Sequence, residues 1–310
     1  MDANDIPHGQ HVSTPDAARP STAKIWLLAT RPKTLTAAAV PVVVGTALAH
    51  AAGKFAPAQA LAALLVAFFI QIGTNFANDL FDFKKGADTE ERLGPLRVTS
   101  AGLVTPRQIT IACALAMSLA FLCGLFLVYS TSWLLLIVGI VSILSGLAYT
   151  GGPFPLAYNA LGDLFVFIFF GLVATVGTYY VQTLSLDPAA FWYAVPVGAL
   201  STAILIVNNL RDVHTDKKHR KITTAVLLGP SVTRFFYLAM ILLAYAIPVV
   251  MYLTEQGPAL AMLALGSFPI AIIALKNVWT RQGAELNKVL AQTSILLLTT
   301  CLLMSLGLIL

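Results

Sequence analysis

The sequence predicts an all-α integral membrane protein, a bundle of nine transmembrane helices. Two observations support this fold class. The chain of 310 residues is 58% hydrophobic and only 11% charged, whereas an ordinary soluble domain is about 25% charged. Nine apolar stretches also approach the length of about 20 residues that a helix needs to span the hydrocarbon core. The mean hydropathy of +0.82 agrees, so soluble classes of protein are excluded.

Connections of alternating length separate the nine stretches. The first helix follows Arg31-Pro32-Lys33, where the proline suits a helix start. Short connections near 51–57, 130–132, 183–189 and 254–256 predict tight turns, and the turn at Ser130-Thr131-Ser132 predicts an antiparallel hairpin. The longest and most polar connections, about 84–107 and 211–231, follow the second and sixth helices. The expected helices are 34–52, 58–83, 108–129, 133–149, 160–182, 190–210, 232–253, 257–275 and 289–310.

The basic residues predict the orientation of the bundle. If the N-terminus lies in the cytoplasm and the chain crosses nine times, all of the 19 Lys and Arg except Lys54 fall on the cytoplasmic side. Cytoplasmic loops of membrane proteins carry such an excess of positive charge. We therefore expect a multi-pass protein of the cell inner membrane whose active site faces the cytoplasm, and we do not interpret the net charge of +5 as nucleic-acid binding. Residues 1–23 are expected to be a disordered cytoplasmic tail, and residues 24–310 the nine-helix membrane domain.

The first of two acidic clusters led by Asn follows the second apolar stretch. It contains Asn75, Asn78, Asp79 and Asp82 and continues to Asp88. The spacing places Asn75, Asp79 and Asp82 on one face of a helix, with Asn78 on the same side. A carboxylate in the hydrocarbon region costs roughly 2.5–3.5 kcal/mol. Repeated acids at such positions therefore indicate a functional site.

The second cluster follows the sixth apolar stretch and contains Asn208, Asp212 and Asp216. These residues share one face if the helix continues. Both clusters are expected at the cytoplasmic side. Carboxylate and amide oxygens suit Mg²⁺, which also accepts ligand phosphates. The sequence therefore predicts a site for Mg²⁺ and a diphosphate, with Asn75, Asp79, Asp82, Asp212 and Asp216 as metal ligands.

A diphosphate also needs cationic partners, and basic residues follow both clusters. Some of these cations would equally serve as membrane anchors. The candidates for diphosphate binding are Lys84, Lys85, Arg97, Arg211, Arg220 and Lys221. Further polar residues are expected on the same face, among them Tyr149 and Asp163. Together with Asp82, Tyr149 is a candidate catalytic residue, and the residues left for the acceptor or without a definite role are Arg31, Lys33, Asn78, Asp88, Asp163 and Asn208.

Four stretches give the chain a resemblance to the superfamily of UbiA-type intramembrane prenyltransferases, and within it to the branch that acts on 1,4-dihydroxy-2-naphthoate. They begin at Arg31, Asn78, Tyr149 and Asn208 and read RPKTL, NDLFDFKKGAD, YTGGP followed by LGD, and NNLRD followed by Asp216. The resemblance extends from about residue 26 to the C-terminus. One departure is Ala157-Tyr158-Asn159-Ala160, where that branch has Gly-Tyr-x-Gly.

The resemblance implies an enzyme that depends on Mg²⁺. Such an enzyme transfers a polyprenyl group from a polyprenyl diphosphate to 1,4-dihydroxy-2-naphthoate with loss of the carboxylate, giving demethylmenaquinone for menaquinone biosynthesis. It implies that the apolar tail lies between helices, open to the bilayer, and Tyr149 is the candidate to stabilise an allylic cation.

Two alternatives stay open. The same chemistry could serve another aromatic acceptor, such as 4-hydroxybenzoate or homogentisate. Alternatively, the acids could mark an ion-coupled transporter, because intramembrane carboxylates also line ion pathways. A transporter would place them near the middle of the membrane, whereas this sequence places them at one face beside basic loops.

Overall fold

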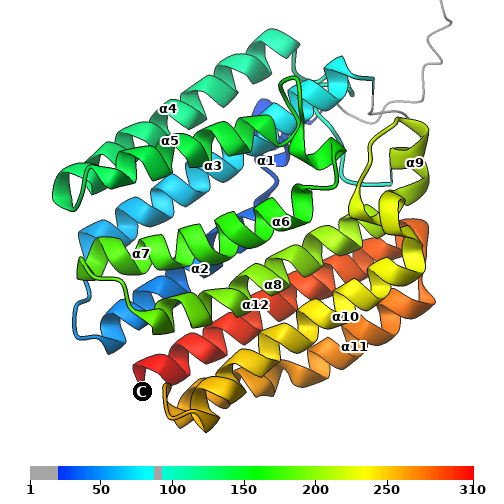
Figure 1. Ribbon diagram of the computed structural model, residues 1–310. Coiled ribbons are helices and arrows are strands. Elements are labelled where there is room, and N and C mark those ends of the chain that lie inside the picture. Colours follow the sequence, from blue (N-terminus) through cyan, green and yellow to red (C-terminus); the bar gives the residue numbers. More distant parts are fainter. Residues whose placement is uncertain (1–19, 87–92) are drawn as a thin grey trace, which may run out of the picture.

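The computed structural model describes residues 20–86 and 93–310, and in these ranges the chain is almost wholly helical (Figure 1). A single bridge between Asn159 and Ile222 is the only β-type pairing there. The segments η1, η3 and η4 are 3-10 helices, and η2 is a π-helix. In chain order the elements are α1 (Thr22–Thr30), α2 (Pro32–Ala51), α3 (Pro57–Lys84), α4 (Pro106–Ser130), α5 (Leu134–Ala148), η1 (Leu156–Tyr158), α6 (Gly162–Val166), η2 (Phe167–Val173), α7 (Ala174–Thr183), α8 (Pro188–Arg211), α9 (Val213–Lys218), α10 (Thr224–Leu253), η3 (Ala259–Ser267), α11 (Phe268–Thr280), η4 (Gly283–Glu285) and α12 (Leu286–Ile309).

Long apolar helices confirm the predicted membrane bundle. Within the described ranges, eight stretches are long and apolar enough to cross a membrane. The ninth expected helix is α5, which has only 15 residues. It packs beside α4 and α3, and the connection between α4 and α5 is the short turn that the sequence predicted.

Two expected boundaries were wrong, because α11 ends at Thr280 and not at residue 275, and α10 begins at Thr224 and not at residue 232. The side chain of Thr223 accepts a hydrogen bond from the backbone N–H of Val226 and so caps this helix. Gly229, at φ 78°, then interrupts the helical backbone just before Pro230. Because Gly229-Pro230 resembles a helix boundary, the sequence predicted a helix start after it and missed the first turns of α10. The polar connection expected over 211–231 is therefore mostly helix, formed by α9 and the start of α10.

Small residues let α8 pass close to its neighbours at the centre of the bundle. The fifth expected helix is a composite of α6, η2 and α7, and it crosses α8 where Gly171 meets Gly198. A Cβ added at Gly171 would lie 2.7 Å from the Cα of Gly198. Such small residues are typical of helix crossings in membranes. Because α8 also packs against α10 and α12, most of its side chains are buried.

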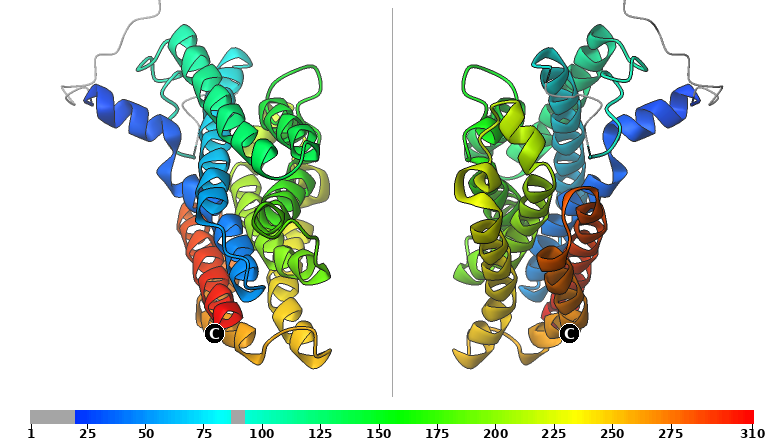
Figure 2. Two further views of the ribbon diagram at one scale, coloured as in Figure 1. Left: turned by 90° about the vertical axis from the view of Figure 1, so that its left-hand side faces the viewer. Right: turned by 90° about the vertical axis from the view of Figure 1, so that its right-hand side faces the viewer.

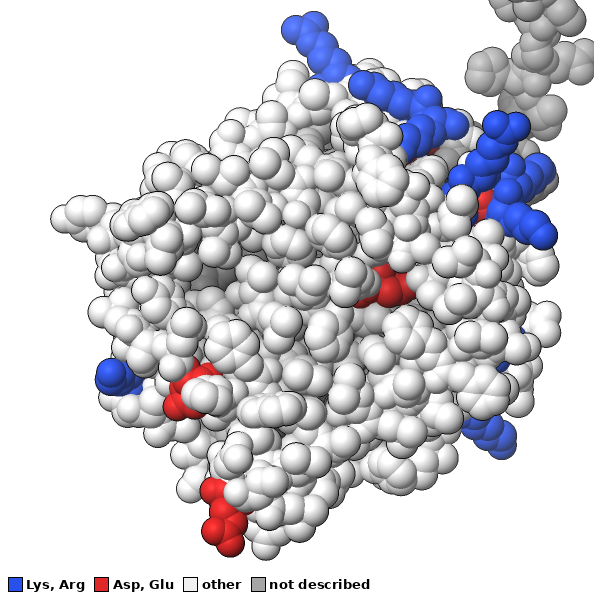
Figure 3. All heavy atoms as spheres, in the orientation of Figure 1, with Lys and Arg blue, Asp and Glu red and all other residues white. Residues whose placement is uncertain are grey.

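The two ends of the bundle are unlike. The connections after α3 and α8 and the short helix α9 lie on the right-hand side of Figure 1, and the opposite end has short turns. We call the end with α9 and the C-terminal ends of α3 and α8 the basic end. Lys and Arg gather along the upper and right-hand edges in Figure 3.

The N-terminal part differs from the expected tail. Helix α1 begins at Thr22, inside the range 1–23 expected to be disordered, and residues 1–19 lie outside the described residues. Figure 2 shows α1 leaving the bundle at an angle. Its inner side remains attached, because the Trp26 ring meets the Phe76 ring of α3 edge to face at 5.9 Å between centroids.

Candidate active site

The last turns of α3 bury the polar side chains of the first cluster, namely Asn75, Asn78, Asp79 and Asp82. Asn75 contacts the start of the chain. Its Nδ2 donates to the Thr30 carbonyl at 3.0 Å and to the Thr34 hydroxyl at 2.9 Å. It therefore fastens the turn between α1 and α2, and its role as a metal ligand stays a prediction.

Two carboxylates hold the loop that follows α3. The two oxygens of Asp79 accept the backbone N–H groups of Val98 and Thr99, each at 3.1 Å. Asp82 forms a buried ion pair with Arg97, with 2.6 Å between Oδ2 and Nη2. Its other oxygen accepts the Tyr158 hydroxyl at 2.9 Å. Residues 97–99 thus pack against the C-terminal end of α3.

The turn after α5 docks on the same cluster. The Thr150 hydroxyl donates to Asn78 Oδ1 at 2.7 Å, and Lys85 Nζ donates to the Thr150 carbonyl at 2.7 Å. Gly152 adopts φ 77°, which favours glycine in this turn. Partial desolvation lowers the pKa of the Lys85 ammonium, and the Asp82 carboxylate opposes this shift. Lys85 is therefore a cation of the first cluster, and its role in binding a diphosphate stays a prediction.

In the second cluster an arginine holds the first carboxylate. Nε and Nη2 of Arg211 donate to the two oxygens of Asp212 at 2.8 and 2.6 Å. The guanidinium also donates to Asn208 Oδ1 at 2.8 Å and to Asn287 Oδ1 at 2.9 Å. Arg211 is buried, so this two-pronged pair neutralises a charge away from water.

The expected continuous helix of the second cluster breaks at Asp212, where α8 ends and α9 begins. Asp216 still follows one turn later, and its N–H donates to the Asp212 carbonyl at 2.8 Å. Its Oδ1 lies 3.2 Å from Lys221 Nζ. Its Oδ2 is buried and has no hydrogen-bond partner in the described part of the chain. Burial raises the pKa of Asp216, Lys221 lowers it, and the charges of Asp212 and Asp82 raise it again. The two clusters lie near each other, because the hydroxyl of Tyr158 binds Asp82 and its ring centre lies 5.7 Å from Lys221 Nζ.

Tyr149 and Asp163 complete the polar face. Burial and then the charges of Asp163, Asp82 and Asp216 raise the pKa of the Tyr149 phenol. A Cβ added at Gly162 would lie 3.2 Å from the Tyr149 hydroxyl, so this tyrosine reaches the start of α6. Asp163 accepts a hydrogen bond from the Thr224 hydroxyl.

Two residues that sequence reasoning did not single out join the clusters. Tyr158 contacts Asp82 as above, and its carbonyl accepts the N–H of Ile222, just after the second cluster, at 3.2 Å. Asn287, near the start of α12, donates to the Leu93 carbonyl at 2.9 Å while its Oδ1 accepts from Arg211. Tyr158 was named in the sequence only as part of the departure Ala157-Tyr158-Asn159-Ala160, without a role, and nothing in the sequence distinguished Asn287.

The remaining predicted residues are more exposed or are not described. Lys84, Arg220 and Lys33 are exposed, and Arg31 is half-buried. Lys84 Nζ lies 6.0 Å from the centre of the Phe81 ring. Asp88 lies outside the described residues, so its predicted role is not tested.

The oxygen atoms of the site suit an Mg²⁺ ion that a phosphate ligand also coordinates better than an ion held by protein side chains alone. Among residues 20–86 and 93–310, no three side chains of His, Cys, Asp or Glu gather closely enough to hold an ion. Asp79 and Asp82 already bind other groups, but Asp216 offers a buried oxygen that lacks a partner. Mg²⁺ commonly keeps waters and ligand phosphates in its coordination shell. The residues therefore suit an ion that binds a phosphate ligand as well.

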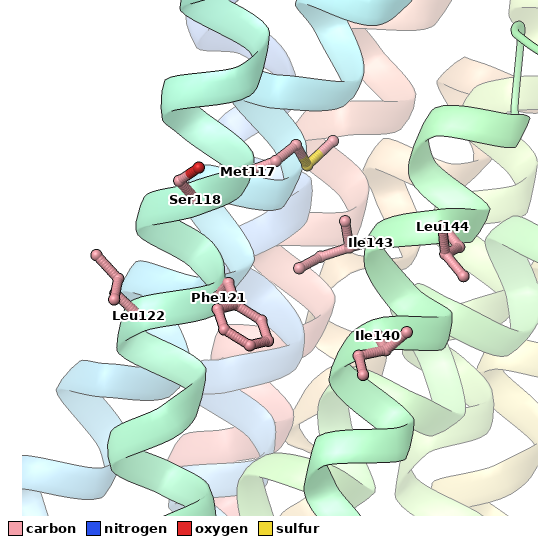
Figure 4. A pocket seen from close by; sticks show the side chains of 7 residues that line it. All are labelled: Met117, Ser118, Phe121, Leu122, Ile140, Ile143 and Leu144. Atoms are coloured by element: carbon pink, nitrogen blue, oxygen red, sulfur yellow. The ribbon is translucent and has the colours of Figure 1, made fainter.

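A groove between α4 and α5 belongs to the apolar surface and not to the polar face. Met117, Phe121 and Leu122 line it from α4, and Ile140, Ile143 and Leu144 line it from α5 (Figure 4). Ser118 is the only polar residue of this lining, and none is charged.

Comparisons with known proteins agree with this arrangement. The model of the UbiA prenyltransferase family matches residues 38–303. The 1,4-dihydroxy-2-naphthoate octaprenyltransferase of Mycobacterium leprae is 37% identical, over 87% of this chain and 91% of its own length. The enzyme of that name from Mycobacterium tuberculosis is 39% identical, over 89% and 94%. A UbiA homologue from Archaeoglobus fulgidus, solved bound to DMAPP and Mg²⁺, has the same fold, with a TM-score of 0.61 and 15% identity over 90% of this chain and 99% of that one.

Proposed function

This chain belongs to the UbiA prenyltransferase family, and from that membership we propose that it transfers a polyprenyl group from a polyprenyl diphosphate to 1,4-dihydroxy-2-naphthoate. The acceptor loses its carboxylate as carbon dioxide, and the product is the quinol form of demethylmenaquinone. The protein is thus a 1,4-dihydroxy-2-naphthoate prenyltransferase of menaquinone biosynthesis, in line with the enzymes that it resembles over nearly its whole length.

One structural observation supports this reaction above the others. Two carboxylate-bearing helix ends, from α3 and from α8 with α9, lie at the basic end, and cations accompany both. Tyr158 links them, because its hydroxyl donates to Asp82 and its ring centre lies 5.7 Å from Lys221 Nζ. A diphosphate with Mg²⁺ needs this combination of oxygen ligands and positive charge. The proposed metal ligands are Asp82 and Asp216, with Asn75, Asp79 and Asp212 as further candidates. Lys85, Arg97 and Lys221 are the proposed partners of the diphosphate, and Lys84, Arg211 and Arg220 remain candidates.

The reaction breaks the allylic C–O bond of the donor and forms a bond between the prenyl carbon and the acceptor ring. Mg²⁺, when bound, supplies positive charge to the departing diphosphate. Lys85 and Lys221 add charge of the same sign at the basic end. Tyr149 offers a π-face to the allylic cation. The electron-rich naphthalene ring attacks that cation, and carbon dioxide leaves the ring.

The positions of the acids disfavour the alternative of an ion-coupled transporter. In the described part of the chain, Asp and Glu lie at helix ends or in connections, and none lies in the middle of a spanning helix. An ion pathway would need such groups at mid-membrane depth. The alternative of another aromatic acceptor is left to experiment, because Arg31 and Lys33 could attract the carboxylate of several aromatic acids.

Product analysis tests the proposed function. Purified protein is incubated with Mg²⁺, a series of polyprenyl diphosphates and three acceptors in competition, namely 1,4-dihydroxy-2-naphthoate, 4-hydroxybenzoate and homogentisate. We expect mass spectrometry to detect the prenylated and decarboxylated naphthoate product, and EDTA to abolish it until Mg²⁺ is restored. Preferred prenylation of another acceptor would move the enzyme to another branch of the family. Full activity in EDTA would contradict the metal requirement.

A further inference from the structure

Tyr158 lies at the junction of the two acidic clusters. It belongs to η1, which follows the turn after α5. Its backbone carbonyl accepts the N–H of Ile222, and the N–H of Ala160 donates to the Ile222 carbonyl at 2.7 Å. These two bonds fix η1 against the segment between α9 and α10. The position of the Tyr158 ring is therefore set by the second half of the bundle.

The hydroxyl of Tyr158 reaches the first half. It donates to Asp82 Oδ1 at 2.9 Å, while Arg97 holds the other oxygen at 2.6 Å. A carboxylate with a donor on each oxygen cannot rotate freely. Tyr158 thus sets the direction in which the remaining lone pairs of Asp82 point.

The ring of Tyr158 also lies near two ammonium groups, one from each cluster. Lys85 Nζ lies 3.9 Å from the ring centre, and Lys221 Nζ lies 5.7 Å from it. Both distances are within the range of attraction between a cation and an aromatic face. Lys85 is anchored by the Thr150 carbonyl at 2.7 Å and Lys221 by Asp216 at 3.2 Å. A ring that attracts both cations reduces the cost of holding like charges close together.

We propose that Tyr158 is a positioning residue that orients Asp82 for the metal and aligns Lys85 and Lys221 for the diphosphate of the donor. This inference rests on the proposed function, in that the ligand is a prenyl diphosphate with Mg²⁺. The proposal assigns separate roles to two parts of the Tyr158 side chain. The hydroxyl acts on the metal side of the site, and the ring acts on the phosphate side.

Two substitutions separate these roles. Tyr158→Phe removes the hydroxyl and keeps the ring, and Tyr158→Leu removes both. The matched controls are Tyr129→Phe and Tyr129→Leu, because Tyr129 lies at the far end of α4 with 92% of its surface exposed. Calorimetry measures Mg²⁺-dependent binding of farnesyl diphosphate, and steady-state assays measure the Mg²⁺ concentration at half-maximal rate and the KM for the donor.

We expect Tyr158→Phe to raise the Mg²⁺ requirement about tenfold or more, as for loss of a hydrogen bond to a charged group, with the donor KM at saturating Mg²⁺ nearly unchanged. Tyr158→Leu should raise the donor KM as well, and the controls should change neither quantity. Equal effects of both Tyr158 substitutions on both quantities, or a loss of thermal stability alone, would overturn the proposal. The binding measurement needs no acceptor, so a wrong acceptor would not hide the result. Absence of Mg²⁺-dependent binding by the unaltered protein would overturn the proposed function itself.

Discussion

At the scale of single residues, three acids of the site are matched with bases. The pairs are Asp82 with Arg97, Asp212 with Arg211, and Asp216 with Lys221. A buried charge without a partner costs several kcal/mol, so these pairs allow carboxylates to lie at the end of a membrane bundle. All three guanidinium nitrogens of Arg211 donate hydrogen bonds to protein oxygens. This favours a role for Arg211 in positioning Asp212 over a role in binding a phosphate.

Helical spacing predicted part of this site and could not predict the rest. It placed Asn75, Asp79 and Asp82 on one face of α3, and all three are buried there. Spacing along one helix says nothing of partners that come from elsewhere in the chain. Tyr158 is 76 residues away from Asp82, and Asn287 is 76 residues away from Arg211. Only the packing of the helices brings such residues together.

Asp216 Oδ2, which is buried without a hydrogen-bond partner in the described part of the chain, leads to a prediction that compares the effects of Asp216→Asn and Asp79→Asn. Asp216→Asn should lower Mg²⁺-dependent turnover by about 100-fold or more, because a preorganised charge is lost from the site. The fold should survive, because the Lys221 partner is not fully buried. Asp79→Asn should instead lower thermal stability, because the amide keeps one acceptor oxygen but directs its NH2 group at the N–H of either Val98 or Thr99, a loss of about 1–3 kcal/mol. Thermal unfolding in detergent and turnover assays measure both effects, and wild-type turnover by Asp216→Asn would refute the assignment of Asp216 as a ligand.

At the scale of elements, apolar length predicted where the chain crosses the membrane but not how each helix is built. The fifth crossing contains the π-helical segment Phe167–Val173, and the eighth begins as the 3-10 segment Ala259–Ser267. The apolar content of a stretch is the same for every type of helix, so composition could not reveal these changes. The early start of α10 was missed for a related reason, since Gly229-Pro230 marks a break inside the helix and not its beginning.

The crossing of η2 and α8 gives a prediction with a control in the same spanning helix. Gly171→Ala would place a Cβ 2.7 Å from the Gly198 Cα and 3.1 Å from the Ala194 carbonyl. We expect a loss of about 1–3 kcal/mol, typical of overpacking, and a lower Tm. Gly177→Ala should hold or slightly raise the Tm, because nothing lies within 4 Å of its added Cβ and alanine favours helix. Equal Tm values for the two variants would show that the close crossing does not limit stability.

At the scale of the whole molecule, the sequence predicted that nearly all Lys and Arg lie on one side of the membrane, and the basic end of the bundle corresponds to that side. The ends of α3 and α8, which carry the two clusters, both lie on the right-hand side of Figure 1 at the basic end, although they are far apart in the chain. Lys54 is the exception at the other end, and its ammonium lies 3.4 Å from the Thr183 carbonyl. Because cytoplasmic loops collect positive charge, we propose that the basic end and its active site face the cytoplasm.

This orientation predicts which residues a membrane-impermeant thiol reagent can reach in intact cells. The starting protein has Cys113, Cys123 and Cys301 replaced by Ala, and each test protein carries one new cysteine at an exposed position. His214→Cys and Arg107→Cys lie at the basic end, and Glu255→Cys lies in the connection between α10 and η3 at the other end. We expect the reagent to label Glu255→Cys from outside, and to label the two basic-end cysteines only after the membrane is opened, because a nine-crossing chain with its N-terminus inside puts these ends on opposite sides of the bilayer. Retained prenyl transfer shows that each variant is folded. External labelling of either basic-end cysteine in an active variant would invert the orientation and place the carboxylate clusters outside the cytoplasm.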